Sequence, residues 1–135
     1  MSTDPLEQVF VKPEQVEGQH RALLAKLIFP FAGINAESGE VHFKPTADDL
    51  NSKQKILVYL LCRLALSTRP NTSFSAAVSP KEVEHGTNLP GGTVRPKLSQ
   101  LVDERIVLKS GDGYMVPASS LNRALKELES AIPEV

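Results

Sequence analysis

Residues 78–117 read VSPKEVEHGTNLPGGTVRPKLSQLVDERIVLKSGDGYMVP. The first part of this stretch predicts a short capped helix. Ser79 and Glu82 are spaced as a capping box, in which the Ser79 hydroxyl accepts from the Glu82 N–H and the Glu82 carboxylate accepts from the Ser79 N–H. Pro80 falls at the first helical position, where no N–H is needed. Gly86 is expected to end this helix, because glycine readily takes the left-handed conformation.

A second helix is predicted after the turn at Gly91-Gly92. Thr93 is expected to cap it, and Pro96 to lie within its first turn, where proline is tolerated. An apolar stripe then recurs at helical spacing, formed by Val94, Leu98, Leu101 and Val102. This pattern predicts a helix with one buried side.

The chain then alternates as a β-hairpin does. Ile106 and Leu108 are expected to face the same way, residues 109–113 to turn, and residues 114–116 to return. The simpler alternative is a small α+β core with a hairpin, in which the second helix does not enter a DNA groove. The agreement of several independent signals in one register favours a helix–turn–helix followed by a wing.

Residues 47–116 resemble the winged-helix superfamily, in particular its small bacterial and archaeal regulators. The resemblance implies an α+β, mainly helical fold: a winged helix-turn-helix with an added amino-terminal helix and hairpin and a carboxy-terminal helix. It also implies that a recognition helix over residues 93–105 enters the DNA major groove. The wing tip at residues 109–113 would touch the backbone or the minor groove.

The outward side of the predicted recognition helix carries the DNA hypothesis. With the apolar stripe turned inward, the residues expected to point outward are Pro96, Ser99, Gln100 and Asp103, flanked by Arg95 and Lys97. Gln100 is suited to read adenine, and Ser99 to meet a base edge or a phosphate. Arg95 and Lys97 would neutralise phosphates near the helix start, with Lys109 steadying the wing. The complete set of candidate DNA-binding residues is Thr93, Arg95, Lys97, Ser99, Gln100 and Lys109.

The charges across this motif are balanced, which favours a second hypothesis. Asp103 and Glu104 would oppose the DNA backbone, whereas a dedicated nucleic-acid binder usually shows a basic face. The alternative is a protein-interaction module that uses the winged-helix scaffold or the helix face around Tyr59. The first hypothesis predicts double-stranded DNA and a homodimer as partners, and the second a protein partner in a larger assembly.

Composition sets the outer limits. The 135 residues, with a net charge of −1, suit one compact domain without global attraction to nucleic acid or membrane. We expect three parts: an amino-terminal arm, helix and hairpin at 1–46, the winged helix at 47–117, and a terminal helix at 118–135. The single cysteine, Cys62, excludes an internal disulfide and fits a reducing cytoplasm. No segment has the pattern of a signal peptide or membrane span.

The remaining elements follow from local pattern. We expect an arm at residues 1–16, a helix at 14–28, a hairpin within 31–44, a main helix from Ser52, a linker at 67–77, and a last helix capped by 118–120. The hairpin either pairs with the wing or caps the core. Residues 56–61 are apolar nearly all round and need cover on more than one side. The amino-terminal helix, the carboxy-terminal helix or a second subunit could supply that cover.

The sequence contains no recognisable pattern of catalytic residues. His20, His42 and His85 lie far apart in the sequence without an HxxxH pair, and the chain has a single cysteine, so a zinc site is not expected. Residues 89–93 superficially resemble a phosphate cradle but lack the preceding strand and the Gly-Lys-Ser/Thr ending. We therefore expect neither an enzyme nor a bound metal or cofactor.

Overall fold

The computed structural model describes residues 13–69 and 74–132, with side chains from residue 18 onward. Within these residues the fold is α+β and mainly helical, with five α-helices and two separate two-stranded antiparallel sheets. The expected arm up to residue 12, linker residues 70–73 and the closing Pro133 lie outside the described residues. No helix in the described part of the chain is long and apolar enough to cross a membrane.

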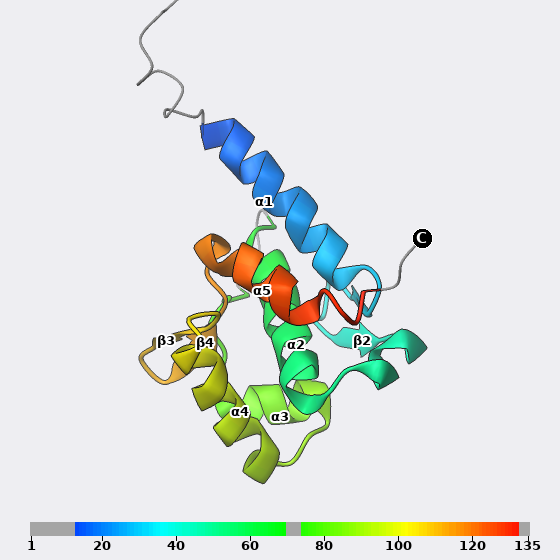
Figure 1. The fold of residues 1–135 in the computed structure, drawn as a ribbon, viewed down its shortest axis with the longest axis vertical. Coiled ribbons are helices and arrows are strands. Elements are labelled where there is room, and N and C mark those ends of the chain that lie inside the picture. Colours follow the sequence, from blue (N-terminus) through cyan, green and yellow to red (C-terminus); the bar gives the residue numbers. More distant parts are fainter. Residues whose placement is uncertain (1–12, 70–73, 133–135) are drawn as a thin grey trace, which may run out of the picture.

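Helix α2 (Ser52–Ser67) is the centre of the fold (Figure 1). It begins where the sequence predicted, because Asn51 and Gln54 form a capping box: Asn51 Oδ1 accepts from the Gln54 N–H at 2.8 Å, and the Asn51 N–H donates back to Gln54 Oε1 at 3.0 Å. The Asp48-Asp49 pair belongs to a preceding 3-10 helix, η2 (Pro45–Asp49). The residues that α2 buries completely are Ile56, Leu57, Val58, Leu60, Leu61 and Cys62.

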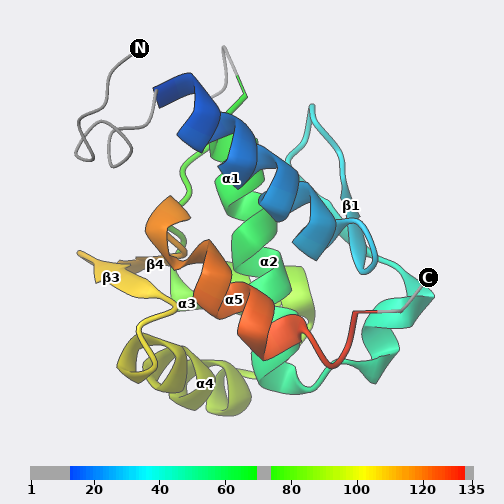
Figure 2. The same cartoon turned by 45° about the horizontal axis from the view of Figure 1, so that its top comes forward.

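Helices α1 (Pro13–Ile28) and α5 (Leu121–Leu128) cover one side of α2 (Figure 2). Leu27 of α1 and Leu128 of α5 are fully buried in the common core. The cover for the apolar middle of α2 is therefore provided within the chain. A 3-10 helix, η3 (Ala118–Ser120), leads into α5, but Ser120 does not cap α5 as expected: its hydroxyl donates to the carbonyl of Arg105 at 3.2 Å.

The amino-terminal hairpin forms a sheet of its own. Strands β1 (Ala32–Ile34) and β2 (Val41–Phe43) pair with Ile34 opposite Val41, and the fully buried Phe31 stands just before them. The Lys44 N–H donates to the Phe31 carbonyl at 2.7 Å, which closes the hairpin base. Of the two placements that the sequence left open, the hairpin caps the core and does not pair with the second hairpin.

Gly86 was expected to end the first helix of the motif, but it lies inside helix α3 (Pro80–Thr87). The helix continues through Gly86, and Asn88 ends it in the left-handed conformation with φ of 57°. A Cβ at residue 86 would stand 2.2 Å from Cε2 of Tyr59. Gly86 thus serves a close helix–helix approach and not a turn. At the start of α3, Ser79 Oγ accepts from the Glu82 N–H at 3.2 Å, which is the first of the two expected capping bonds.

Helix α4 (Gly91–Asp103) begins two residues before the predicted start. The carbonyl of Pro90 accepts from the N–H groups of Thr93 and Val94, at 2.9 and 3.0 Å, so the first turn closes around the two glycines. Thr93 is therefore not the cap. Pro96 lies in the second turn, where its missing N–H deprives the Gly92 carbonyl of a helical bond.

The second hairpin is tighter than expected. Strands β3 (Leu108–Ser110) and β4 (Gly113–Met115) are joined by Gly111 and Asp112 alone. Ile106 and Leu108 do not share a face: Ile106 is buried, whereas Leu108 is 53% exposed. The N–H groups of Ile106 and Val107 both donate to the Leu101 carbonyl, so the chain is still leaving α4 there and strand alternation starts only at Leu108.

Candidate nucleic-acid interface

Helix α4 has one buried side and one open side. Val94, Leu98 and Leu101 are fully buried in the core, where α4 packs against α2 and α3. The opposite side is exposed and polar or small, and consists of Gly92, Arg95, Pro96, Ser99, Gln100 and Asp103. This set is called the outer row below. Residues three and four apart share a helix face, so the outer row forms one continuous surface.

The structure brings together most of the residues predicted to bind DNA. Arg95, Ser99 and Gln100 lie on the outer row. Thr93 and Lys97 are half-buried at its flanks. Arg95 and Ser99 are one turn apart, so a cation and a hydroxyl point the same way along the helix. The predicted outward direction of Ser99 and Gln100 is confirmed.

The second hairpin stands beside α4, on the side of the molecule away from α1 (Figures 1 and 2). Lys109 is exposed on β3, and its ammonium lies 5.8 Å from the ring centroid of Tyr114 on β4. Val78, just before α3, exchanges two backbone hydrogen bonds with Tyr114, at 3.0 and 2.8 Å. These two bonds hold the hairpin against the segment that precedes α3.

Lys53 of α2 neutralises one of the acidic groups that the sequence placed near this surface. Its ammonium lies 2.9 Å from a carboxylate oxygen of Glu104 and 3.2 Å from one of Glu127. Burial on its own lowers the pKa of Lys53, but hydrogen bonds and charge attraction from the two glutamates outweigh it and leave the pKa above 10.5. Glu104 is therefore directed to Lys53, and Asp103 is the acid that remains on the outer row.

An acidic group also stands at the amino-terminal end of α4. A Cβ at Gly91 would lie 2.9 Å from Oε1 of Glu84, so this carboxylate of α3 faces the first turn of α4. The positive end of the helix dipole stabilises a carboxylate in that position. It also repels a phosphate from the helix start, which argues against a phosphate cradle at residues 89–93. Of the residues predicted to bind DNA, the cations are Arg95, Lys97 and Lys109, and none of them lies in this first turn around Gly91.

Other candidate groups are not assembled into a site. His42 and His85 are exposed, and the described residues contain no cluster of three His, Cys, Asp or Glu side chains that could hold a metal. Tyr59 is buried against α3, so the helix face around it is not available to a protein partner. Cys62 is fully buried, and burial raises its pKa to about 12.

Comparison with protein-family models, curated proteins and solved structures finds no match to this chain. We therefore infer function from the geometry of α4 and the second hairpin. Helical spacing predicted four members of the outer row, Pro96, Ser99, Gln100 and Asp103; the exposure of Gly92 and Arg95 beside them came from the structure. Sequence reasoning missed Lys53 and Glu84, since their contacts with Glu104 and Gly91 join different helices and leave no local signal.

Proposed function

We propose that residues 47–117 form a winged helix-turn-helix through which the protein binds double-stranded DNA, as a transcriptional regulator or a related DNA-associated factor. The observation that carries this proposal is the outer row of α4. Its residues are exposed and either polar or small, on a helix whose other side is buried in the core. A helix held in this way can enter the major groove without losing core contacts.

In this arrangement, Gln100 and Ser99 reach base edges, and Arg95 contacts the phosphate backbone. Lys97 and Thr93 approach the backbone from the flanks of the outer row. Lys109 on the second hairpin contacts an adjacent phosphate or the minor groove. The glycine at position 92 leaves the second residue of α4 without a side chain that would hold the helix away from DNA.

The proposal is tested by titrating the full chain against random-sequence duplex DNA at about 50 and about 200 mM salt, and sequencing the bound fraction. We expect binding that weakens as salt rises and an enriched motif; a palindromic motif would indicate a symmetric dimer. Arg95→Gln should weaken binding, whereas Lys26→Gln, which removes the same charge from the exposed surface of α1, should not.

The exposed Leu108 favours a second candidate function, a protein-interaction module built on the same scaffold. Leu108 is 53% exposed on β3, next to the exposed Lys109. A protein interface tolerates such an apolar group at its centre, whereas a phosphate contact does not use it. If the folded protein binds no DNA at either salt, and a partner recovered from source cells is lost on Leu108→Ser, this second function replaces the first.

A further inference from the structure

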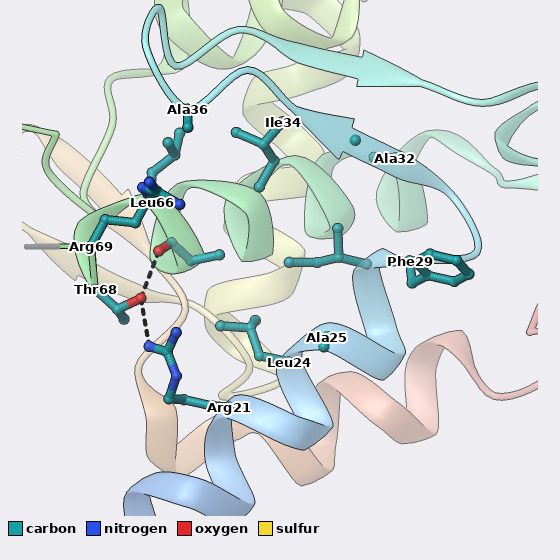
Figure 3. Close-up of a pocket in the computed structure, with 13 residues that line it drawn as sticks. Arg21, Leu24, Ala25, Phe29, Ala32, Ile34, Ala36, Leu66, Thr68 and Arg69 are labelled. Atoms are coloured by element: carbon teal, nitrogen blue, oxygen red, sulfur yellow. Dashed lines mark hydrogen bonds between the residues drawn. The ribbon is translucent and has the colours of Figure 1, made fainter.

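A groove of about 380 Å³ runs between α1 and β1 and reaches the end of α2 (Figure 3). Small-molecule sites typically span ~300–1,000 Å³, so the groove can hold a small ligand. Its apolar lining comes mainly from Leu24, Ala25, Ile28, Ala32, Ile34 and Leu66. The groove belongs to neither α4 nor the second hairpin.

Two charged residues line this groove: Arg21 of α1, and Arg69, which lies just after α2. Figure 3 shows both on the side of Thr68, away from Phe29. Arg21 Nη1 donates to Thr68 Oγ1 at 3.1 Å, and Thr68 Oγ1 donates in turn to the Ala65 carbonyl at 2.7 Å. The guanidinium of Arg21 is thereby held at the end of α2.

No carboxylate neutralises these two cations within the described residues. The ion pairs found there join His42 to Glu40, and Lys53 to Glu104 and Glu127. Two positive charges thus line the same end of an apolar groove, in a chain whose net charge is −1. A guanidinium is a planar donor that matches a carboxylate with two parallel hydrogen bonds.

The rest of the groove is elongated and apolar. The α1 residues that line it extend from Arg21 to Ile28, which at the helical rise of 1.5 Å per residue is about 10 Å. Phe29 lies at the end opposite the arginines and is 74% exposed (Figure 3). This arrangement complements a molecule with an anionic head and an extended apolar tail.

We propose that this groove binds a medium-chain alkyl carboxylate. The carboxylate lies at Arg21 and Arg69, and the alkyl chain runs along Leu24, Ile28 and Ile34 towards Phe29. The site is separate from the proposed DNA surface on α4, so failure of either proposal leaves the other standing.

Calorimetric titration of the full chain with octanoate, and with octanol as a matched uncharged ligand, tests this proposal. We expect octanoate to saturate one site and octanol to bind at least about tenfold more weakly, because a charge-assisted hydrogen bond is lost. Octanoate should also shift the methyl NMR signals of Leu24, Ile28 and Ile34. Equal affinities for the two ligands, or no saturable binding by the folded protein, would overturn the proposal.

Variants of the two arginines test whether the carboxylate of octanoate binds beside them. The double substitution Arg21→Gln with Arg69→Gln should weaken octanoate binding at least about tenfold and leave octanol binding unchanged. Lys26→Gln, on the same helix but outside the groove lining, is the matched control and should bind octanoate as the unaltered protein does. Thermal unfolding of each variant verifies folding. If the folded double variant retains full affinity for octanoate, the carboxylate does not bind at these arginines and the proposed site is wrong.

Discussion

The ring of Tyr59 on α2 occupies the space that a side chain at Gly86 of α3 would need. A Cβ at residue 86 would lie 2.2 Å from Cε2 and 2.5 Å from Cζ of Tyr59. Real Cβ atoms do not approach carbon atoms so closely, and the ring is buried, so it has little room to move. The contact fixes how closely α3 approaches α2, and therefore the platform against which α4 packs.

Gly86→Ala is expected to destabilise the protein by about 1–3 kcal/mol, the usual cost of overpacking. This cost exceeds the ~0.5–1 kcal/mol that alanine gains over glycine inside a helix. Urea unfolding measures the difference. Gly18→Ala, in α1 with nothing within 4 Å of the added Cβ, is the matched control and should be stabilising. Equal stabilisation by both substitutions would show that the ring of Tyr59 moves aside without loss of stability.

Lys53→Gln should reduce the free energy of unfolding by about 1 kcal/mol, in the upper range for ion pairs near the surface. The side chain of Lys53 is 13% exposed and bridges Glu104 and Glu127, so its loss leaves two carboxylates without their shared cation. Lys126→Gln, at an exposed position on α5, is the control. If both variants unfold at the same urea concentration, the bridge contributes nothing to stability.

The same lysine predicts a pH dependence. Its pKa is raised above 10.5 in the folded protein, so its contribution is present in full below the unfolded pKa and is lost as pH rises through the folded pKa. The stability difference between the unaltered protein and Lys53→Gln should therefore shrink above pH 10.5. A difference that grows in that range would contradict the raised pKa.

Cys62 should resist alkylation by iodoacetamide at neutral pH until the protein unfolds, because the thiolate is the reactive form and burial raises the pKa of this thiol from 9.0 to about 12. Mass spectrometry with and without denaturant measures the labelling.

The raised pKa of the Cys62 thiol also makes stability depend on pH. The unfolded protein loses the thiol proton more readily, so the contribution of Cys62 to stability is lost as pH rises from 9.0 towards about 12. Cys62→Ala should reduce the slope of stability against pH in that alkaline range.

Asn88→Ala should destabilise the end of α3 by about 1–2 kcal/mol, the cost of placing a residue with an ordinary Cβ in the left-handed region. Asn88 has φ of 57° there. Asn88→Gly is the informative partner, since glycine adopts this conformation without steric cost and should retain the stability. Urea midpoints of the two variants compare them directly. Equal loss in both would assign the effect to the asparagine side chain and not to the backbone.

Lys109→Ala and Gln100→Ala should affect DNA binding in different ways if α4 and the second hairpin form the interface. Loss of a phosphate contact by Lys109 should weaken all sequences alike and reduce the slope of log affinity against log salt by about 1. Loss of Gln100 should relax the preference at one base pair by about 1–3 kcal/mol. Sequencing of bound duplexes at two salt concentrations separates the two effects. A uniform effect of Gln100→Ala would remove it from base reading.

Local pattern was enough to predict much of the fold. The start of α2 at Ser52, the apolar stripe of α4 and the hairpin turn within residues 109–113 each depend on residues close in the sequence. Helical spacing alone also predicts that Ser99 and Gln100 point away from the core. These features follow from the sequence because backbone hydrogen bonding and side-chain periodicity depend on near neighbours.

Only the tertiary structure decided the features that join distant segments. From the sequence, Gly86 was predicted to end a helix. In the structure it allows α3 to approach the ring of Tyr59 closely. Cover for α2 comes from α1 and α5. The two arginines that line the proposed carboxylate groove are 48 residues apart in the sequence, at positions 21 and 69. The sequence by itself determined where helices and turns form, through contacts between near neighbours. Folding decided which faces meet, because packing depends on shape and charge between residues that the chain order does not place together.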